Sequence, residues 1–243
     1  MTRWISTGFA LVFALVLAAP AAAQRDRDRD WDTDRGPRET ETVDRTLTMQ
    51  PGGTLKLNTF SGKVRITGAA GNQVVVHAVR RATRDRLNDI KLEVTQSGNR
   101  VEIDVNHRLV ERRNDNVVDT DLEITVPTQT ALELKTFSAP ITVIGVNGRQ
   151  NIDGFSSGIT IEAREWTDGN DLDIHTFSGE INLRLPDSAR GDIDFNSFSG
   201  EFQSDLPVTM TSSSRRNFRG ALNGGGNTDF RLKTFSGGVN IRR

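Results

Sequence analysis

Apolar and polar residues alternate in short runs through residues 43–243, and six of these runs are interrupted by Phe-Ser and a small residue. The shared pattern is Φ-x-Φ-x-[TS]-F-S-G-x-Φ-x-Φ, where Φ is apolar. In the fourth copy, Leu172 and Ile174 alternate with polar residues before this corner, and Ile181 and Leu183 do so after it. Alternation with period 2 predicts β-strands that bury one face.

The corner itself is expected to turn or bulge, because the step from Ile174 to Ile181 is odd where period 2 demands an even one. Glycine follows the serine in most copies and supplies backbone freedom, while Ala139 and Ser157 stand there in two copies, so the position accepts only small residues. The six corners, which are the repeat residues of the prediction, are Phe60, Ser61, Gly62; Phe137, Ser138; Phe155, Ser156; Phe177, Ser178, Gly179; Phe198, Ser199, Gly200; and Phe235, Ser236, Gly237.

The period of the repeat predicts an all-β, single-stranded β-solenoid with rungs of about 20 residues. The middle copies begin 18, 22 and 21 residues apart, and a strand-like repeat of this length is typical of stacked solenoids. Consecutive copies then form neighbouring rungs about 4.8 Å apart, and equivalent residues form columns. Burying a Phe side chain contributes about 1.5–3 kcal/mol, so we expect the phenylalanines to form an inner ladder of the core.

Two stretches outside the repeat predict antiparallel structure. The first separates copies one and two; its Ser97-Gly98-Asn99 turn indicates a hairpin, and residues 82–90 indicate one or two helical turns. The second, residues 205–229, reads as a hairpin with a flexible tip. Such segments would cap or flank the solenoid, because an open end exposes unpaired backbone. The expected strands of the first stretch are residues 74–79, 91–96, 101–106 and 121–126.

Residues 1–23 have the pattern of a signal peptide. Arg3 precedes an apolar run at residues 8–17, and three alanines precede Gln24, which predicts cleavage between Ala23 and Gln24. The mature protein is then periplasmic or secreted to the cell surface and is not an integral membrane protein; an uncleaved anchor is the alternative. Residues 24–42 alternate Arg and Asp and predict a disordered charged linker before the domain at residues 43–243.

Composition narrows the chemistry. The 243 residues include no Cys, which excludes disulfides and thiol chemistry, and the formal net charge is −1. A balanced charge argues against nucleic acid as a partner. One local basic cluster, Arg80, Arg81, Arg84 and Arg86, remains an alternative partner site; smaller basic pairs are Arg112 with Arg113 and Arg215 with Arg216.

Two pairs of acidic residues are candidates for catalytic carboxylates. If consecutive copies are neighbouring rungs, Asp173 lies beside Asp194, and Glu180 lies beside Glu201, as paired carboxylates do in glycoside hydrolysis. Their outward positions favour a solvated surface instead, with cation binding as a further alternative.

Other chemical signatures are absent from the sequence. His77, His107 and His175 have no metal-ligand spacing, and neither a G-x-S-x-G motif nor a phosphate-binding glycine loop occurs. We therefore predict no catalytic, cofactor-binding or metal residues and no cofactor.

The motif T-F-S-G-x-Φ-x-Φ, the stretch DLEITVP running into ALELKTFS, the antiparallel segment and the signal peptide together resemble the bacterial putative-adhesin domain family of unknown function. The resemblance extends from about Thr46 to the last residue. It implies a β-solenoid of the bacterial envelope without known enzymatic activity, cofactor or catalytic residues. The corner Phe departs from the family, whose members often carry other residues before Ser-Gly.

These observations lead us to expect a non-enzymatic, exported, adhesin-like protein that binds or organises envelope polysaccharide or protein through its outward residues. A polysaccharide-acting β-helix enzyme is one alternative. The other is a structural envelope protein that self-associates through the ends of the solenoid.

Overall fold

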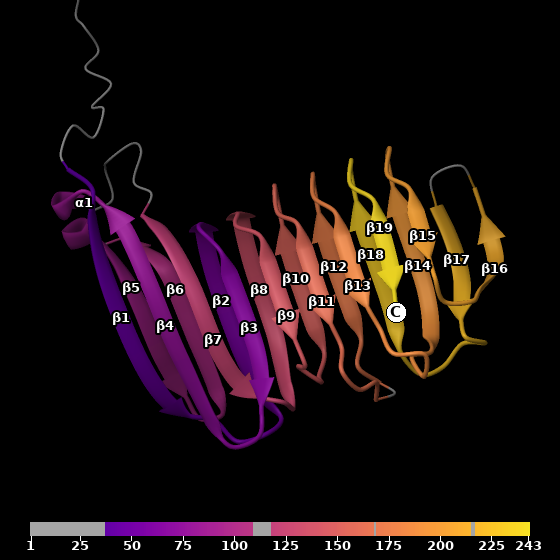
Figure 1. Cartoon of the computed structure of the whole chain (residues 1–243), viewed down its shortest axis with the longest axis horizontal. Helices are drawn as coiled ribbons and strands as arrows, with labels where there is room; N and C mark the ends of the chain where they lie inside the picture. The colour runs from indigo at the N-terminus through magenta and orange to yellow at the C-terminus, as the bar shows by residue number, and fades with distance from the viewer. Residues whose placement is uncertain (1–36, 109–117, 168, 215–216) are drawn as a thin grey trace, which may run out of the picture. The chain divides into compact units, whose positions relative to one another are not determined.

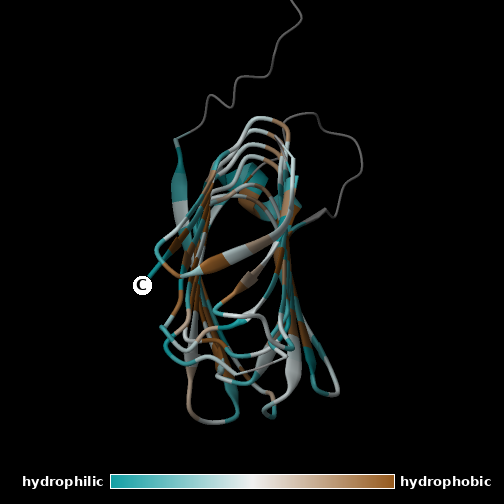
Figure 2. Ribbon diagram, turned by 90° about the vertical axis from the view of Figure 1, so that its right-hand side faces the viewer, coloured by the Kyte–Doolittle hydropathy of each residue, from teal (hydrophilic) through white to brown (hydrophobic). Residues whose placement is uncertain are grey.

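Two β-sheets lie opposite each other and enclose an apolar core (Figures 1 and 2). The computed structural model describes residues 37–108, 118–167, 169–214 and 217–243, which belong to the unit Gly36–Arg243. The predicted signal peptide with its Ala23/Gln24 cleavage point lies outside the described residues. So do residues 24–36 of the predicted linker and the basic pairs at 112–113 and 215–216.

The first sheet has nine strands and mixes parallel with antiparallel pairs. Their spatial order is β1 (Glu39–Thr48), β4 (Gln73–Ala82), β7 (Asp119–Pro127), β3 (Val64–Ala69), β9 (Ile141–Ile144), β11 (Ile159–Glu162), β13 (Ile181–Arg184), β19 (Val239–Arg242) and β15 (Phe202–Ser204).

The second sheet has ten strands. Their spatial order is β16 (Val208–Ser213), β17 (Asn217–Leu222), β14 (Gly191–Ser197), β18 (Asp229–Thr234), β12 (Leu172–Thr176), β10 (Gln150–Gly154), β8 (Thr130–Ser138), β2 (Gly53–Ser61), β6 (Arg100–Arg108) and β5 (Ile90–Ser97).

Each copy of the sequence pattern gives one strand to the second sheet, passes its Phe-Ser corner and gives the next strand to the first sheet. Equivalent residues of neighbouring copies pair in parallel register; Ile174, for example, lies beside Ile152 on one side and Leu232 on the other. The all-β class and a solenoid-like stacking of parallel strands are therefore confirmed. The sheets are mixed, however, because antiparallel strands flank the parallel ones at both ends.

The order of the copies along the stack differs from their order in the sequence. Strands β18 and β19 of copy six lie between copy four (β12 and β13) and copy five (β14 and β15). The expectation that consecutive copies always form neighbouring rungs is wrong here. The reason is that β17 pairs with the far side of β14, and the chain then crosses β14 to fill the position next to β12.

The core consists of the inward residues of both sheets. Leu134, Ile152 and Ile174 form one such column, each at most 1% exposed, and Ile141, Ile159 and Ile181 form a column on the facing sheet. Figure 2 shows the two sheets end-on as two facing walls. Burial of these aliphatic side chains is the main stabilisation of a chain without disulfides.

The two predicted antiparallel segments are present. Strands β5 and β6 form a hairpin, β16 and β17 form another, and the helix α1 spans Arg84–Asp89. Strand β1 pairs with β4 from Glu39 onward, so the last four residues of the predicted linker are strand. Their Thr and Glu side chains alternate in burial, which lets β1 extend the sheet. Among the described residues, no helix has the length and apolarity needed to span a membrane.

Candidate binding surface

The six corner phenylalanines are exposed, which corrects the prediction of an inner ladder. Their exposed fractions range from 37% for Phe60 to 52% for Phe198. The physical reason is the alternation itself: Leu172, Ile174 and Thr176 all point inward, so the next residue, Phe177, points outward. The small Thr or Ser before each Phe is buried in five copies: Thr59, Thr136, Thr176, Ser197 and Thr234.

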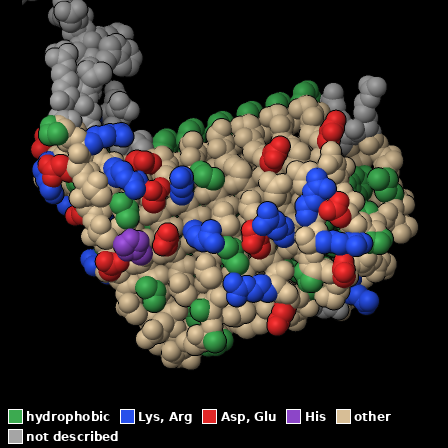
Figure 3. All heavy atoms as spheres, viewed as in Figure 1, with side chains coloured by type: hydrophobic (Ala, Val, Ile, Leu, Met, Phe, Trp, Pro, Cys, Tyr) green, Lys and Arg blue, Asp and Glu red, His purple; other side chains and the backbone are tan. Residues whose placement is uncertain are grey.

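The exposed rings stack on one another and follow the spatial order of the strands. From one end to the other the ladder is Phe60, Phe137, Phe155, Phe177, Phe235 and Phe198, with ring centroids 4.6–4.9 Å apart and interplanar angles of 2–14°. Figure 3 shows a line of hydrophobic side chains along one edge of the domain. The four inner rings have a neighbouring ring on each face, so their free surface is the ring edge.

The backbone of the corners holds the ladder in register. The Ser156 amide donates a hydrogen bond to the Phe137 carbonyl at 2.7 Å, and the Ser178 amide donates one to the Phe155 carbonyl at 2.9 Å. The hydroxyls of Ser156 and Ser178 are 3.0 Å apart. Because the corner amides bond to the next rung, the spacing of the rings equals the spacing of the strands.

Most corner glycines are required because the neighbouring rung lies too close to leave room for a Cβ atom, and not because the backbone adopts a left-handed conformation. Only Gly62 among them has a left-handed backbone, with φ of 101°. A Cβ at Gly179 would lie 2.0 Å from the carbonyl oxygen of Ser157, and one at Gly237 would lie 1.9 Å from that of Gly179. The contact between Gly237 and Gly179 also shows that copy six stacks directly on copy four.

A groove of about 880 Å³ runs beside the ladder; we call it the ladder groove. The rings form one wall, the buried Thr and Ser residues line its base, and a column of polar residues two positions before each Phe completes it. This polar column consists of Asn58, Lys135, Asp153, His175, Lys233 and Asn196. Sequence reasoning missed these residues, although the spacing from Phe would have identified them once the rings were placed outside.

At the middle of the groove, His175 lies between two carboxylates. Its Nδ1 is 3.6 Å from Oδ1 of Asp153, and its Nε2 is 3.0 Å from Oδ1 of Asp173. Within the described ranges, no three His, Asp or Glu side chains are arranged to hold a metal ion. The groove therefore combines apolar ring edges with side chains of both charges.

The acidic pairs of the catalytic hypothesis are not brought together. Arg231 of the inserted copy six lies in register between Asp173 and Asp194. The rung that carries Gly238 likewise separates Glu180 from Glu201, because Val239 pairs with both Ile181 and Phe202. The prediction that the two acids of each pair lie on adjacent strands is thus wrong, because one strand lies between them in both cases.

The remaining histidines lie elsewhere. The Nδ1 of His77 is 2.6 Å from Oδ1 of Asp44 on neighbouring strands β4 and β1. The side chain of His107 lies outside the described part of the chain.

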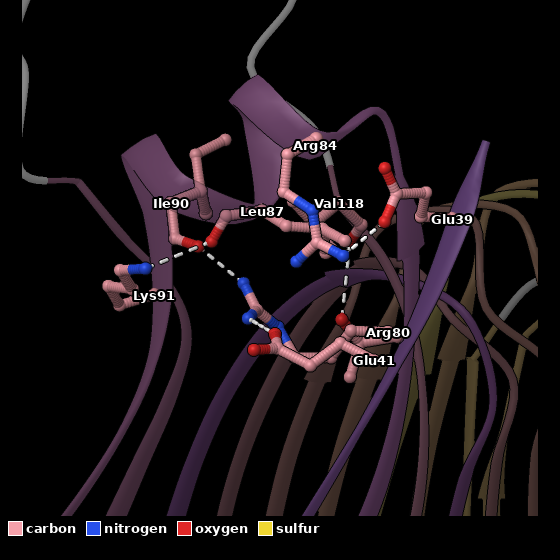
Figure 4. Close-up of polar contacts among 9 residues, drawn as sticks. Glu39, Glu41, Arg80, Arg84, Leu87, Ile90, Lys91 and Val118 are labelled. Atoms are coloured by element: carbon pink, nitrogen blue, oxygen red, sulfur yellow. Dashed lines mark hydrogen bonds and ion pairs between the residues drawn. The ribbon is translucent and has the colours of Figure 1, made fainter. Parts of the chain in front are cut away.

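Three arginines of the predicted basic cluster bind neighbouring acidic side chains and a backbone carbonyl, so they do not form an open basic patch (Figure 4). Arg80 is 2% exposed and donates to Glu41 and to the carbonyl of Ile90, which ties β1 and β5 to β4. Arg84 donates to Glu39. Nearby, Arg81 bonds Asp121 at 2.7 Å, and this hydrogen bond raises the pKa of the guanidinium.

Charged residues also form a column on the outer face of the second sheet. Glu133 accepts two hydrogen bonds from Arg100, at 3.0 and 2.5 Å, and Lys56 donates to Glu102 at 2.5 Å. The hydrogen bonds from Arg100 lower the pKa of the Glu133 carboxyl. This paired surface contrasts with the apolar edge along the ladder.

Taken together, the fold and the ladder define an all-β, solenoid-like domain with one exposed aromatic edge. The family model described as Toastrack DUF4097 matches residues 116–242, and the chain belongs to this family. The match confirms the resemblance to an adhesin-type domain of unknown function. No curated protein matches the chain significantly.

Two solved structures match the chain. A putative cell adhesion protein from Clostridium sporogenes ATCC 15579 superposes with a TM-score of 0.60 at 15% identity, covering 83% of this chain and 99% of that one. A putative adhesin from Bacteroides fragilis NCTC 9343 gives a TM-score of 0.33 at 10% identity, covering 83% and 97%. The first likeness establishes a shared fold.

Proposed function

We propose that the protein is an exported, non-enzymatic binding module of the cell envelope that holds a protein partner along the ladder groove. The observation that carries this proposal is the row of six stacked phenylalanines, each 37–52% exposed. The predicted signal peptide supports the envelope as its location. The Clostridium protein with the same fold is a putative cell adhesion protein, which supports an adhesive role for this domain.

The size of the apolar edge supports a binding role. A Phe side chain has roughly 200 Å² of surface, so six that are nearly half exposed present roughly 500 Å². Apolar patches of about 300–600 Å² are the largest on typical monomers and are often functional. The domain keeps this surface in water although inward positions for aromatic rings exist, as the fully buried Phe230 demonstrates.

The orientation of the rings favours protein over polysaccharide as the partner. Sugars stack their C–H bonds on the electron-rich face of an aromatic ring, and in the ladder the faces of the inner rings are covered by other rings. Ring edges instead suit contact with aliphatic and aromatic side chains. The corner amides already donate to neighbouring rungs, so the partner would bind through side chains and not as an added strand.

The polar column gives the groove a means of selecting its partner. Lys135 and Lys233 flank Asp153 and His175, so a partner needs charges of both signs at matching intervals. Charge patterns of this kind direct orientation and association rate more than they raise affinity.

The alternative of a polysaccharide-acting enzyme has less support, because a positive residue or an intervening rung separates the acids it would use. Paired carboxylates in retaining and inverting glycosidases stand roughly 5–9.5 Å apart across the scissile bond. Arg231 occupies the position between Asp173 and Asp194. Glu180 and Glu201 are two strand spacings, about 9.6 Å, apart, at the upper limit of this range.

The proposal is tested by capture from native envelope fractions with the mature protein and with the double variant Phe155→Ser/Phe177→Ser. The matched control is Val75→Ser, which also removes an exposed hydrophobic side chain, 40% exposed, but on β4 away from the groove. We expect the ladder variant alone to lose binding. Envelope treated with protease should also lose the partner, and envelope treated with glycan hydrolases should retain it.

Two results would overturn the proposal. One is equal binding by the ladder variant and the control. The other is a partner that survives protease and disappears after glycan hydrolysis, which would return the function to polysaccharide binding.

A further inference from the structure

Copy six lies between two pairs of strands that both come earlier in the sequence. We call this position the slot and the two strand pairs its walls. Strands β18 and β19 pair in parallel with β12 and β13 of copy four on one side and with β14 and β15 of copy five on the other. Without copy six, these walls would face each other across the width of one missing rung. Residues 229–242 therefore complete a site formed by residues 171–205.

The slot is specific for copy six. Four apolar side chains enter the core from it and are fully buried: Phe230, Leu232, Val239 and Ile241. On the outer face, Arg231 lies between Asp173 and Asp194. The same column holds Lys56, Glu133 and Asn151 in the first three copies, and Glu133 in this slot would meet two carboxylates.

Contacts on the other sheet add to this specificity. The side-chain amide of Asn240 donates to Oδ1 of Asn182 at 3.1 Å, and Arg242 bonds Asp205 at 2.9 Å. Only a strand pair with the sequence of copy six can make these contacts in the slot.

A glycine-rich connection attaches copy six to the rest of the domain. Residues 223–228 link β17 to β18, and three consecutive residues, Asn223, Gly224 and Gly225, have φ values of 49°, 84° and 86°. Strands β17 and β18 flank β14, so the connection spans two strand spacings, about 9.6 Å. Six residues reach about 20 Å when extended, so the connection is long enough to adopt other paths.

We propose that copy six is an exchangeable element and that the slot accepts copy six of a second molecule of this chain. The exchanged strands would make every contact of the closed molecule, and only residues 223–228 would change conformation. The partner is therefore a second copy, and the interface is the pair of strand edges on β12–β13 and β14–β15. This inference does not depend on the proposed function of the ladder groove.

Exchange is decided while the domain folds, because the four buried side chains hold copy six in place afterwards. In the unfolded chain, a short glycine-rich connection keeps its own strand pair at an effective concentration of the order of 1 mM. Exchange should consequently be rare at about 10 µM and rise at least tenfold when the protein folds at about 500 µM.

The test uses two single-cysteine variants of the full mature chain, which has no native Cys. Asn182→Cys and Asn240→Cys are mixed, unfolded in denaturant and refolded together under oxidising conditions. Adjacent strand positions lie within disulfide reach, so a 182–240 disulfide between two molecules forms when copy six of one enters the slot of the other.

The matched control is the mixture of Thr142→Cys and Thr160→Cys. These residues are register partners in the same column, but in copies two and three, where joining two molecules would require exchange of an internal rung. We expect the 182–240 species, identified by mass spectrometry, to exceed the control at least fivefold and to grow with concentration.

Equal yields from both mixtures would overturn the proposal, provided the double variant Asn182→Cys/Asn240→Cys closes its disulfide within one molecule. If that disulfide does not close, light scattering decides: the wild-type chain refolded at about 500 µM should contain a dimer, and a monomer at every concentration would overturn the proposal.

Discussion

The substitution Gly237→Ala tests the close stacking of the rungs and the inserted position of copy six together. Gly237 has no positive φ, so alanine can adopt its backbone conformation. Its Cβ, however, would lie 1.9 Å from the carbonyl oxygen of Gly179 and 2.9 Å from Oγ1 of Thr234. The two rungs must separate by more than an ångström to relieve this contact.

The expected cost follows from two sources. Overpacking of this kind costs about 1–3 kcal/mol. The added Cβ also crowds Oγ1 of Thr234 within copy six and strains the hydrogen bond, 2.8 Å long, that this oxygen accepts from the Gly237 amide, which contributes about 0.5–1.5 kcal/mol. A loss of about 2–4 kcal/mol corresponds to a fall in Tm of roughly 5–15 °C for a domain of this size.

The measurement is thermal and urea unfolding followed by circular dichroism, with Gly158→Ala as the control. A Cβ at Gly158 meets no atom within 4 Å, so that variant should unfold within about 0.5 kcal/mol of the wild type. If Gly237→Ala is as stable as Gly158→Ala, copy six does not stack on copy four and the reasoning fails.

Four further substitutions distinguish surface from core and test the charged columns. Phe155→Ala should cost only about 1–2 kcal/mol through lost ring stacking, whereas Phe230→Ala in the core should cost about 3–5 kcal/mol; equal losses in urea unfolding would contradict the exposed ladder. Arg231→Glu places three acids in consecutive strands and should cost about 1–2 kcal/mol, less in 1 M salt; a loss that salt does not reduce would refute the electrostatic account. The lowered pKa of Glu133 means that its contribution, about 0.2–1 kcal/mol for such an exposed pair, is present above its ordinary pKa and lost as the pH falls through the lowered value. Glu133→Gln should therefore be less stable than the wild type at pH 7, and the difference in unfolding free energy should vanish as the pH falls through the lowered pKa of Glu133; a difference that persists in acid would exclude this linkage.

Much of the fold is readable from the sequence because period-2 alternation has a direct physical cause. Inward residues such as Leu172 and Ile174 must alternate with outward ones, and this alternation locates the strands of both sheets. The cap was also accessible, since the turn at Ser97-Gly98-Asn99 joins β5 to β6 as expected.

The position of the ladder was predictable from the same alternation, but the hydrophobicity of Phe argued the other way. Leu172, Ile174 and Thr176 share one parity, and Phe177 has the other. Following the alternation one residue further places Phe177 outside and Thr176 inside. The general preference for burying aromatic rings is thus overruled by a backbone that is already fixed by two aliphatic residues.

The order of the copies was not accessible from alternation, because every copy carries the same pattern and every slot offers the same apolar positions. Only the outward residues distinguish them. Arg231 matches Asp173 and Asp194, but this complementarity becomes visible only when all three are known to share a column. The acidic pairs were misplaced for the same reason.

The central claim is that the phenylalanine ladder is the surface that contacts a protein partner, and site-specific photo-crosslinking tests it most directly. The photoreactive residue benzoylphenylalanine would replace Phe155 in the ladder or Val75 on β4, and the protein would be irradiated in the native envelope. The account predicts a discrete protein adduct from position 155 and none from position 75. Irradiation that yields no adduct at position 155, or the same adducts at both positions, would contradict it.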